Sequence, residues 1–461
     1  MKAMLIITAL GLFAMLAEIF RFKKLLLPVV LIGIAAAFIS NILEWNDPLI
    51  IPYFDNMVSF DKTALALSGV ILITAFCWFI LSNDYFRDDH SKVDHFALIL
   101  FAMVGALMLT AFRNMTTLFL GIEILSIPLY VLAASKKFDL RSNEAGFKYL
   151  IMGSFASAFL LFGIALIYGA AGTFDLAGIR TYIAAGTDLP LFFYAGVLML
   201  FVAMCFKISA APFHFWAPDV YEGSPTLITA FMSTVVKTAA FAAFIRLFLF
   251  DMGNVSMVWT AVLAAVIALS LVIANFTAAV QSSVKRMLAY SSISHAAFML
   301  MVMLANVRSN ITIDAIMYYA LAYSIGSIAA FGVLYNVSKN GDESYEAFNG
   351  LGRRNPAMAL CMTVAMLSLA GIPVTAGFFA KYMVFTTLIG SAYNWLLILG
   401  VITSAVGAYY YLKVIIAMYF RSSDGVHLHI ESSNKTIIIA ATVFTVVIGL
   451  LPELVTGIFG F

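Results

Sequence analysis

The sequence is poor in charged side chains, which make up 11% of its 461 residues, whereas 63% of the residues are hydrophobic. Soluble proteins carry roughly 25% charged residues, so this deficit excludes an ordinary soluble domain. The few charges stand in short clusters between apolar runs of 18 or more residues, a pattern typical of a polytopic helical membrane protein. We therefore expect an all-α membrane protein.

Cysteine is scarce as well. Cys77, Cys205 and Cys361 stand isolated in apolar runs, and this spacing fits neither an iron–sulfur cluster, a zinc site nor a disulfide framework. No glycine-rich loop follows a predicted strand, so no nucleotide site is visible. The formal net charge of +2 gives no indication of nucleic-acid binding. We expect no metal or cofactor on this chain, and any linked redox chemistry would occur elsewhere.

The apolar runs predict about 14 transmembrane helices. They lie near residues 3–20, 25–44, 63–81, 93–112, 115–134, 144–171, 191–216, 226–250, 256–281, 287–306, 312–338, 357–389, 395–420 and 436–460. We expect the first run to be a retained helix rather than a signal peptide, because charged residues such as Glu18 and Arg21 follow it without a cleavage site of small residues.

Basic residues in the loops predict the orientation of the chain. Loops after odd-numbered spans carry Arg21, Lys23, Lys24, Arg87, Lys92, Lys136, Lys137, Arg141, Lys285, Arg286, Lys339, Arg353, Arg354, Arg421 and Lys435. The opposite side carries Lys2, Lys62, Arg113, Arg180 and Arg308. Because cytoplasmic loops are enriched in lysine and arginine, we expect the odd loops in the cytoplasm and both termini on the outer side.

Five ionisable side chains lie deep inside apolar stretches, where a charge is costly. They are Glu123 in 116–134, Lys207 in 192–215, Lys237 in 226–250, His295 in 287–305 and Lys381 in 357–389. A charge at bilayer depth costs about 2.5–3.5 kcal/mol on insertion scales. Ionisable groups repeated along several helices are what a proton or ion relay requires, so we interpret these five residues as a relay.

Glu123 and Lys207 are expected to act as a pair. An opposite charge stabilises both ionised groups, and its removal leaves a buried ammonium group ready to release its proton. Lys237 has no acidic neighbour in sequence, so its burial alone would promote proton exchange. The structural alternatives are a static ion pair for Glu123 and Lys207, and a side chain that reaches the membrane interface for Lys237.

His295 and Lys381 extend the predicted relay. An imidazole both takes and gives protons near neutral pH, so His295 could connect the two halves; the alternative is a core histidine bonded to serine or tyrosine. Lys381 follows a predicted helix break whose polar backbone could carry a proton outward; the alternative is a cap on a half-helix. His214, Glu222 and Lys413 receive no role.

Prolines in two segments predict interrupted helices. Pro212 and Pro218 both stand in the apolar run 207–218, and Pro373 lies between Gly371 and Gly377. Proline removes a backbone donor and clashes with the preceding turn, and such breaks in a bilayer line cavities or are buried in protein. Paired breaks predict two five-helix repeats of opposite orientation. The expected organisation is N-terminal helices over 1–92, a first repeat over 93–250, a second over 256–421 and a C-terminal helix over 435–461.

Three motifs carry a resemblance to a known family. They are FKISAAPFHFWAPDVYEGSPT over 206–226, VKRMLAYSSISH over 284–295 and LSLAGIPVTAGFFAK over 367–381. Together they strongly resemble the antiporter-like membrane subunits of bacterial respiratory complex I, the NADH:quinone oxidoreductase, and most of all the subunit N type. The resemblance covers nearly the whole chain. The family's ion-pair glutamate matches Glu123, and its interrupted-helix, central and terminal lysines match Lys207, Lys237 and Lys381.

The resemblance implies a proton-translocating subunit in the bacterial inner (plasma) membrane, with both termini periplasmic. It implies membrane-arm partners of complex I, with NADH, FMN, iron–sulfur clusters and quinone bound by other subunits and no nucleic acid. Protons would move in response to quinone chemistry in neighbouring subunits, so the chain would be part of an enzyme without holding a redox centre. Two alternatives stay open: a subunit of a multi-subunit cation/proton antiporter or membrane-bound hydrogenase, and a purely structural subunit.

Overall fold

The computed structural model describes residues 1–17, 19–20, 22–45, 54, 56–86, 92–186, 189–305, 310–422 and 430–459. Within these ranges the chain is helical, and its only β-type pairings are three isolated bridges. Four residues used above, Glu18, Arg21, Arg87 and Arg308, lie outside the described residues. The predicted all-α class is confirmed.

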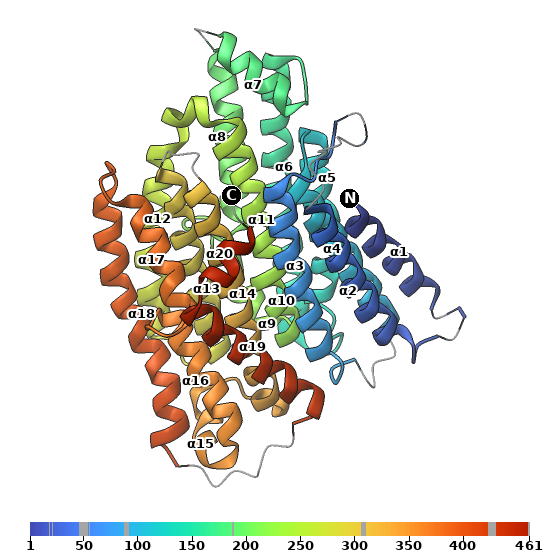
Figure 1. Ribbon diagram of the computed structural model, residues 1–461, viewed down its shortest axis with the longest axis vertical. Helices are drawn as coiled ribbons and strands as arrows, with labels where there is room; N and C mark the ends of the chain where they lie inside the picture. The colour runs from blue at the N-terminus through green and yellow to red at the C-terminus, as the bar shows by residue number, and fades with distance from the viewer. Residues whose placement is uncertain are drawn as a thin grey trace. The chain divides into compact units, whose positions relative to one another are not determined.

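The first half of the chain contains eight helices in the described ranges (Figure 1). They are α1 (Lys2–Leu16), α2 (Leu26–Trp45), α3 (Lys62–Leu81), α4 (Lys92–Ala111), α5 (Met115–Ala133), α6 (Leu140–Ala171), α7 (Leu176–Ala185) and α8 (Leu191–Lys207). Side chains cap several of them: Asn114, Asp139 and Asp175 accept hydrogen bonds from first-turn amides of α5, α6 and α7.

The second half continues in the same way. Its helices are α9 (Trp216–Gly223), α10 (Thr226–Phe231), α11 (Lys237–Phe244), α12 (Ser256–Ala279), α13 (Val284–Met301), α14 (Asn310–Val337), α15 (Leu351–Arg354), α16 (Pro356–Ala370), α17 (Ala376–Leu388), α18 (Asn394–Phe420), α19 (Ser432–Leu450) and α20 (Glu453–Phe459). Two π-helical turns, Met232–Val236 and Ile245–Asp251, continue α10 and α11 into one run over 226–251.

Eleven helical runs of the described residues are long and apolar enough to cross a membrane. About 20 apolar residues are needed to span the hydrocarbon core. Three further apolar helices are shorter, namely α1, α8 and α16, with 15, 17 and 15 residues. The chain is therefore a multi-pass membrane protein. The shortness of α8 and α16 follows from the interruptions described below.

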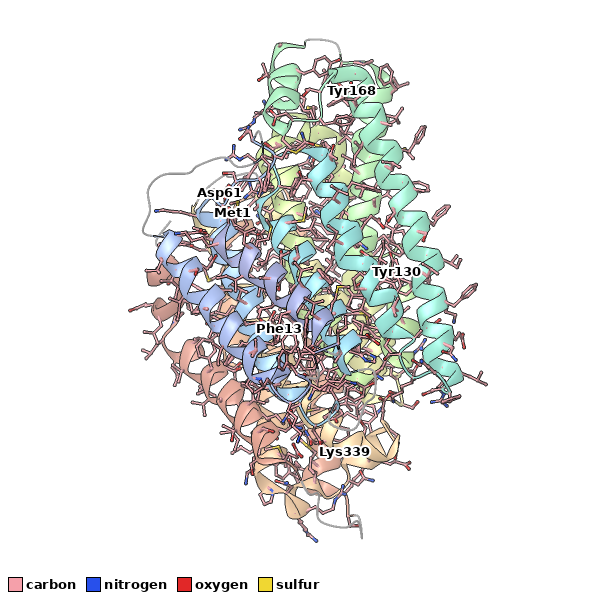
Figure 2. All side chains as sticks on the ribbon, turned by 90° about the vertical axis from the view of Figure 1, so that its right-hand side faces the viewer. Met1, Phe13, Asp61, Tyr130, Tyr168 and Lys339 are labelled. Atoms are coloured by element: carbon pink, nitrogen blue, oxygen red, sulfur yellow. The ribbon has the colours of Figure 1, made fainter. Side chains whose placement is uncertain are left out.

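The helices form two compact units. The first comprises residues 1–76, 86–216 and 235–263. In it α1 packs on α2 and α4, α5 packs on α4 and α6, and α6 packs on α8. Tyr130 of α5 lies against α6 (Figure 2), where its ring centre is 4.7 Å from that of Tyr149. The outer face of α6 carries exposed apolar side chains such as Phe147 and Phe155, as expected for a face in contact with lipid.

The second unit comprises residues 77–85, 217–234 and 264–461. Here α14 is central, since it packs on α13, α16, α17 and α19. α16 and α18 run side by side, both in orange in Figure 1. Among the described residues of α14, those from Ala315 to Val333 are all buried, so this helix is shielded along most of its length.

The first predicted interruption is present. α8 ends at Lys207, and the chain resumes as a helix only at Trp216. Ser209 takes a positive φ of 57° in the intervening segment, and Pro212 follows it. Because proline has no backbone N–H and its ring clashes with the preceding turn, the α-helix cannot run through this position. The break leaves Lys207 as the last residue of α8.

The second interruption is built around Gly371 and Pro373. α16 ends at Ala370 and α17 begins at Ala376. Gly371 adopts φ 84° and its N–H bonds to the carbonyls of Leu367 and Ser368, which is a glycine C-cap. A Cβ on Gly377 would stand 1.7 Å from the carbonyl oxygen of Ser368. Only glycine therefore lets the first turn of α17 pack on the last turns of α16.

The structure differs from the predicted spans in two places. The helix α7 was not predicted; it is a ten-residue amphipathic helix between α6 and α8. The last predicted span, 436–460, is not one helix, because α19 ends at Leu450 and α20 starts at Glu453. Pro452 between them lacks the N–H that a continuous helix would need.

Replacement of Gly377 by alanine should destabilise the second unit. The added Cβ meets a backbone oxygen that cannot rotate away, and overpacking typically costs about 1–3 kcal/mol. The temperature of half-maximal aggregation of the detergent-solubilised protein should fall. Gly326→Ala is the matched control, because its Cβ would meet only the Ser368 hydroxyl oxygen at 3.8 Å. Equal stability of the two variants would contradict the close packing of α17 on α16.

Candidate functional site

The first polar cluster lies where α5, α6 and α8 meet. Lys207 is 8% exposed, and its Nζ donates to the hydroxyl oxygen of Ser126 on α5 at 2.5 Å. Glu123 lies one helical turn before Ser126 on the same face of α5, and it accepts a hydrogen bond of 2.5 Å from Ser157 on α6. Ser126 also donates to the carbonyl of Ile122. Two serines therefore surround the predicted Glu123–Lys207 pair.

The two predicted partners share this cluster but bond to different serines rather than to each other. The hydrogen bond of the Lys207 ammonium goes to Ser126, and that of the Glu123 carboxylate comes from Ser157. Lys207 occupies the C-terminal position of α8, where the helix dipole favours a positive charge. An ammonium with a neutral oxygen partner is held less firmly than one in a close ion pair, which suits a side chain that gains and loses a proton.

Aromatic rings cover the end of α8. The indole N–H of Trp216 donates to the carbonyl of Phe206 at 3.1 Å. Its ring stacks on Tyr149 of α6, with centres 4.8 Å apart and planes inclined by 4°, and also on Phe206. Sequence reasoning left Trp216 without a role. In the structure its indole N–H is a further donor to the Phe206 carbonyl, which also accepts from the backbone N–H of Ser209.

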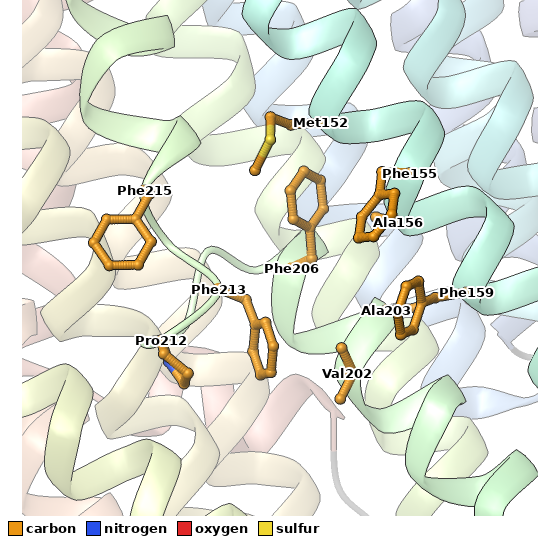
Figure 3. A pocket seen from close by; sticks show the side chains of 10 residues that line it. All are labelled: Met152, Phe155, Ala156, Phe159, Val202, Ala203, Phe206, Pro212, Phe213 and Phe215. Atoms are coloured by element: carbon orange, nitrogen blue, oxygen red, sulfur yellow. The ribbon is translucent and has the colours of Figure 1, made fainter.

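An apolar pocket of about 220 Å³ borders the same break (Figure 3). Phe155 and Phe159 of α6, Val202 and Phe206 of α8, and Phe213 in the break line it. Its walls are almost entirely hydrocarbon, so it offers no hydrogen-bond partner for a proton. The polar face of the break and the apolar face are therefore separate.

Lys237 is the most buried of the predicted lysines, at 2% exposed. It is the first residue of α11 and follows the π-helical turn Met232–Val236. The apolar core of the run over 226–251 is buried throughout, so the side chain is enclosed by protein. π-Turns disturb the regular backbone pairing and often accompany functional positions.

His295 lies in a second polar cluster, built by α13, α14 and α18. Its Nδ1 is 2.7 Å from the hydroxyl of Tyr319, and its Nε2 is 3.2 Å from the hydroxyl of Tyr411. The Tyr411 hydroxyl is also 2.5 Å from that of Ser291. His295 is 4% exposed and the two tyrosines 2% each. The ring of Tyr323 lies 4.9 Å away.

Lys381 is held by the second interruption. Its Nζ donates to the carbonyl of Ala370 at 2.8 Å and to the hydroxyl of Ser404 at 3.3 Å. The ammonium also stands 4.9 Å from the centre of the Phe298 ring, an attractive cation–π distance. Ala370 is the last residue of α16, so the break supplies a carbonyl that an unbroken helix would have used.

A small cavity connects the surroundings of His295 with the second break. It measures about 10 Å³ for the centre of a water-sized sphere, close to the minimum of roughly 10–15 Å³ that holds one water molecule. Its walls include His295, Tyr319 and Tyr323 on one side and Ser368 and Gly377 on the other. Polar groups of the His295 cluster and of the second interruption thus border one space.

Sequence reasoning missed an ion network at the start of α13. Lys285, 2% exposed, donates to Glu343 at 2.9 Å and to the backbone carbonyls of Glu222 and Ser224. Arg286 pairs with Glu222 at 2.5 Å and with Asp219 at 3.0 Å. Both cations lie in the motif over 284–295, and the acids of α9 lie in the motif over 206–226. These opposite charges in two motifs were the signal that the sequence offered. This network ties α9 to α13.

Three further observations concern polar residues outside these clusters. Lys413 donates to the carbonyl of Gln281 at 3.2 Å and stands 4.2 Å from the ring centre of Tyr345. His214 is buried, and its Nδ1 has no hydrogen-bond partner among the described residues. In the part of the chain that the structure describes, no group of three or more histidine, cysteine, aspartate or glutamate side chains could hold a metal ion.

Comparisons with known proteins agree with the motifs. Residues 113–407 match the family model described as NADH:quinone oxidoreductase/Mrp antiporter, TM. The chain is 40% identical over 459 residues to the NADH-quinone oxidoreductase subunit N of Flavobacterium psychrophilum, covering 99% of each chain. It is 41% identical over 465 residues to the same subunit of Cytophaga hutchinsonii, again with 99% coverage of each.

Two solved structures share the fold. A chain of respiratory complex I from Thermus thermophilus is 32% identical and superposes with a TM-score of 0.83, with 98% of each chain covered. A chain of the membrane-bound sulfane sulfur reductase, an archaeal respiratory membrane complex, is 25% identical with a TM-score of 0.89, covering 100% of this chain and 96% of that one.

Proposed function

Because the chain belongs to the family of NADH:quinone oxidoreductase and Mrp antiporter transmembrane subunits, we propose that it translocates protons as a membrane subunit of respiratory complex I. The observation that carries this proposal is the burial of Lys207, Lys237, His295 and Lys381, which are 8%, 2%, 4% and 7% exposed. Charged groups in such positions are costly, and they are kept where protons or ions move.

The proposed relay runs through Glu123, Lys207, Lys237, His295 and Lys381. Movement of Glu123 away from the Lys207 region, or its protonation, would remove the negative charge that favours the ammonium. Lys207 would then release its proton toward Lys237, and His295 would pass it toward Lys381. Quinone chemistry in neighbouring subunits would drive these steps. The redox centres and NADH, FMN and quinone sites would belong to those subunits, with none on this chain.

The architecture that we propose for this function has 14 spans. The eleven long runs are joined by α1 and by the two interrupted helices, α8 with α9 and α16 with α17. We propose two inverted five-helix repeats over 93–250 and 256–421, with N-terminal helices over 1–92 and a C-terminal segment over 435–461. In each repeat a buried lysine lies next to the break, Lys207 in the first and Lys381 in the second, and this correspondence supports the arrangement.

The partners would be other membrane-arm subunits of complex I, in a bacterial inner membrane. The alternative is a subunit of a cation/proton antiporter or of another respiratory membrane complex, since the same fold occurs in the sulfane sulfur reductase. The 40% identity to a subunit N over nearly the full length of both chains favours complex I.

Lys207→Met should abolish most NADH-driven proton pumping and leave the complex assembled. Methionine fills a similar volume without a titrating amine, and replacement of a buried charge by an apolar residue is often neutral for stability. Lys207→Arg should also impair pumping, because guanidinium does not release its proton at physiological pH. Dye quenching in inverted membrane vesicles, with assembly checked on native gels, measures this. Normal pumping by both assembled variants would refute the relay.

Glu123→Gln should be almost as damaging as the loss of Lys207, whereas Glu123→Asp should be milder because it keeps the carboxylate. The reason is that glutamine retains a hydrogen bond to Ser157 but removes the charge. Glu144→Gln is the matched control: its exposed pair with Lys148 on α6 is worth at most about 1 kcal/mol, so pumping should be unchanged. Full activity of Glu123→Gln would show that no charge coupling occurs.

Both termini should lie on the periplasmic face and the loop containing Arg353 in the cytoplasm. The loops after odd-numbered spans carry an excess of basic residues, as cytoplasmic loops do. Cysteine placed at Lys2 should react with a membrane-impermeant maleimide added to intact spheroplasts, whereas cysteine at Arg353 should react only after lysis. Both positions are exposed, so accessibility does not bias the comparison. The reverse pattern would overturn the orientation.

A further inference from the structure

The environment of His295 allows the relay to be extended by two residues that sequence reasoning did not select. We propose that the hydroxyl groups of Tyr411 and Tyr319 carry the proton to and from His295, so that both tyrosines are members of the relay. This inference rests on the proposed function, because it concerns how a proton would pass the histidine.

The geometry places one phenol on each ring nitrogen. Tyr411 stands 3.2 Å from Nε2 and Tyr319 stands 2.7 Å from Nδ1. The hydroxyl of Ser291 continues the line beyond Tyr411, at 2.5 Å. All four residues lie in the same unit and are at most 4% exposed. A row of Ser291, Tyr411, His295 and Tyr319 thus crosses the interior of this unit from α13 and α18 to α14.

A neutral imidazole has one N–H donor and one acceptor nitrogen. When the Tyr411 hydroxyl donates to Nε2, the Nδ1–H donates to Tyr319, and the whole row points in one direction. When Tyr319 donates to Nδ1, the row points the opposite way. The histidine therefore fits between the two phenols in either tautomer, and the row has two states that differ only in the positions of its protons.

Transfer along the row is balanced in atoms and charge. A proton delivered by the preceding group of the proposed relay enters at the Ser291 oxygen. The former hydroxyl proton of Ser291 then moves to the oxygen of Tyr411, while the hydroxyl proton of Tyr411 moves to Nε2. The Nδ1 proton then moves to the Tyr319 oxygen, and the former hydroxyl proton of Tyr319 leaves. Each oxygen and nitrogen holds a hydrogen-bonding position before and after, no electron is transferred, and one proton has passed. After the transfer the imidazole carries its proton on Nε2. The row returns to its first state when the hydroxyl groups rotate and the imidazole again carries its proton on Nδ1.

The proton that leaves Tyr319 has a destination. Tyr319 and His295 border the cavity of about 10 Å³ whose far wall is formed by Ser368 and Gly377. One water molecule is about the size that this space accepts, and the hydroxyl of Ser368 bonds to the N–H of Gly377 in the first turn of α17. Lys381 is on the following turn and is bonded to Ala370. The row therefore leads toward the second interruption.

The test uses intact complex in inverted membrane vesicles. Tyr411→Phe and Tyr319→Phe should each lower NADH-driven proton pumping by roughly tenfold or more, since a positioned proton-transfer group contributes on the order of 10²–10⁴-fold. Tyr318→Phe is the matched control. Its hydroxyl is equally buried and donates to the backbone carbonyl of Ile448 at 2.6 Å, outside the row, so it should keep normal pumping.

A second measurement distinguishes proton transfer by the tyrosines from a purely structural role. Incorporation of 3,5-difluorotyrosine at position 411 makes the phenol more acidic with little change in size, so it should alter the pumping rate and its solvent deuterium isotope effect only if the O–H takes part. An unchanged rate and isotope effect would overturn the proposal, as would normal pumping by assembled Tyr411→Phe. If Lys207→Met also pumped normally, the proposed function itself would fail. Loss in Lys207→Met alone would leave the relay but exclude the tyrosines.

Discussion

The arrangement of this protein depends on the cost of holding amines and an imidazole inside a bilayer. Three buried lysines at about 2.5–3.5 kcal/mol each together amount to roughly the 5–15 kcal/mol that stabilises a whole domain. Such groups persist only if the fold supplies oxygen partners where lipid has none. Ser126 does so for Lys207, and Ala370 with Ser404 does so for Lys381.

The helix breaks are the device that supplies these partners. An unbroken helix uses every carbonyl internally, whereas a helix that ends at Ala370 exposes one to Lys381. The residues that permit the break serve no chemistry of their own. Gly371 provides the left-handed turn and Gly377 the close approach of α17 to α16. The backbone geometry at these positions therefore determines the environment of Lys381, the residue that we propose for proton transfer.

Much of this could be predicted from the sequence, and the exceptions have physical reasons. Hydrophobic runs and prolines act locally, so the all-α class and both breaks, at Pro212 and Pro373, were predictable. The partners of the buried groups come from helices distant in sequence, so Ser126, Ser157 and Tyr411 carried no local signal. For His295 the sequence allowed a serine or tyrosine neighbour, and two tyrosines are present. The helix α7 was missed because its ten residues are too short to resemble a span.

The molecule also contains ion pairs that contrast with the proposed relay. Arg246 is 5% exposed and binds both carboxylate oxygens of Asp61, at 2.8 and 2.9 Å, and Arg286 binds Glu222 at 2.5 Å. Guanidinium stays protonated and its planar fork matches a carboxylate, so these pairs fix helices and exchange no protons. Lys207 and Lys381, by contrast, bond to neutral oxygens, which leaves the charge of each amine free to change. Lys285, which pairs with Glu343, belongs with these fixed ion pairs. The neutral oxygen partners of Lys207 and Lys381 therefore distinguish the lysines that we propose for the relay from the cations that hold helices together.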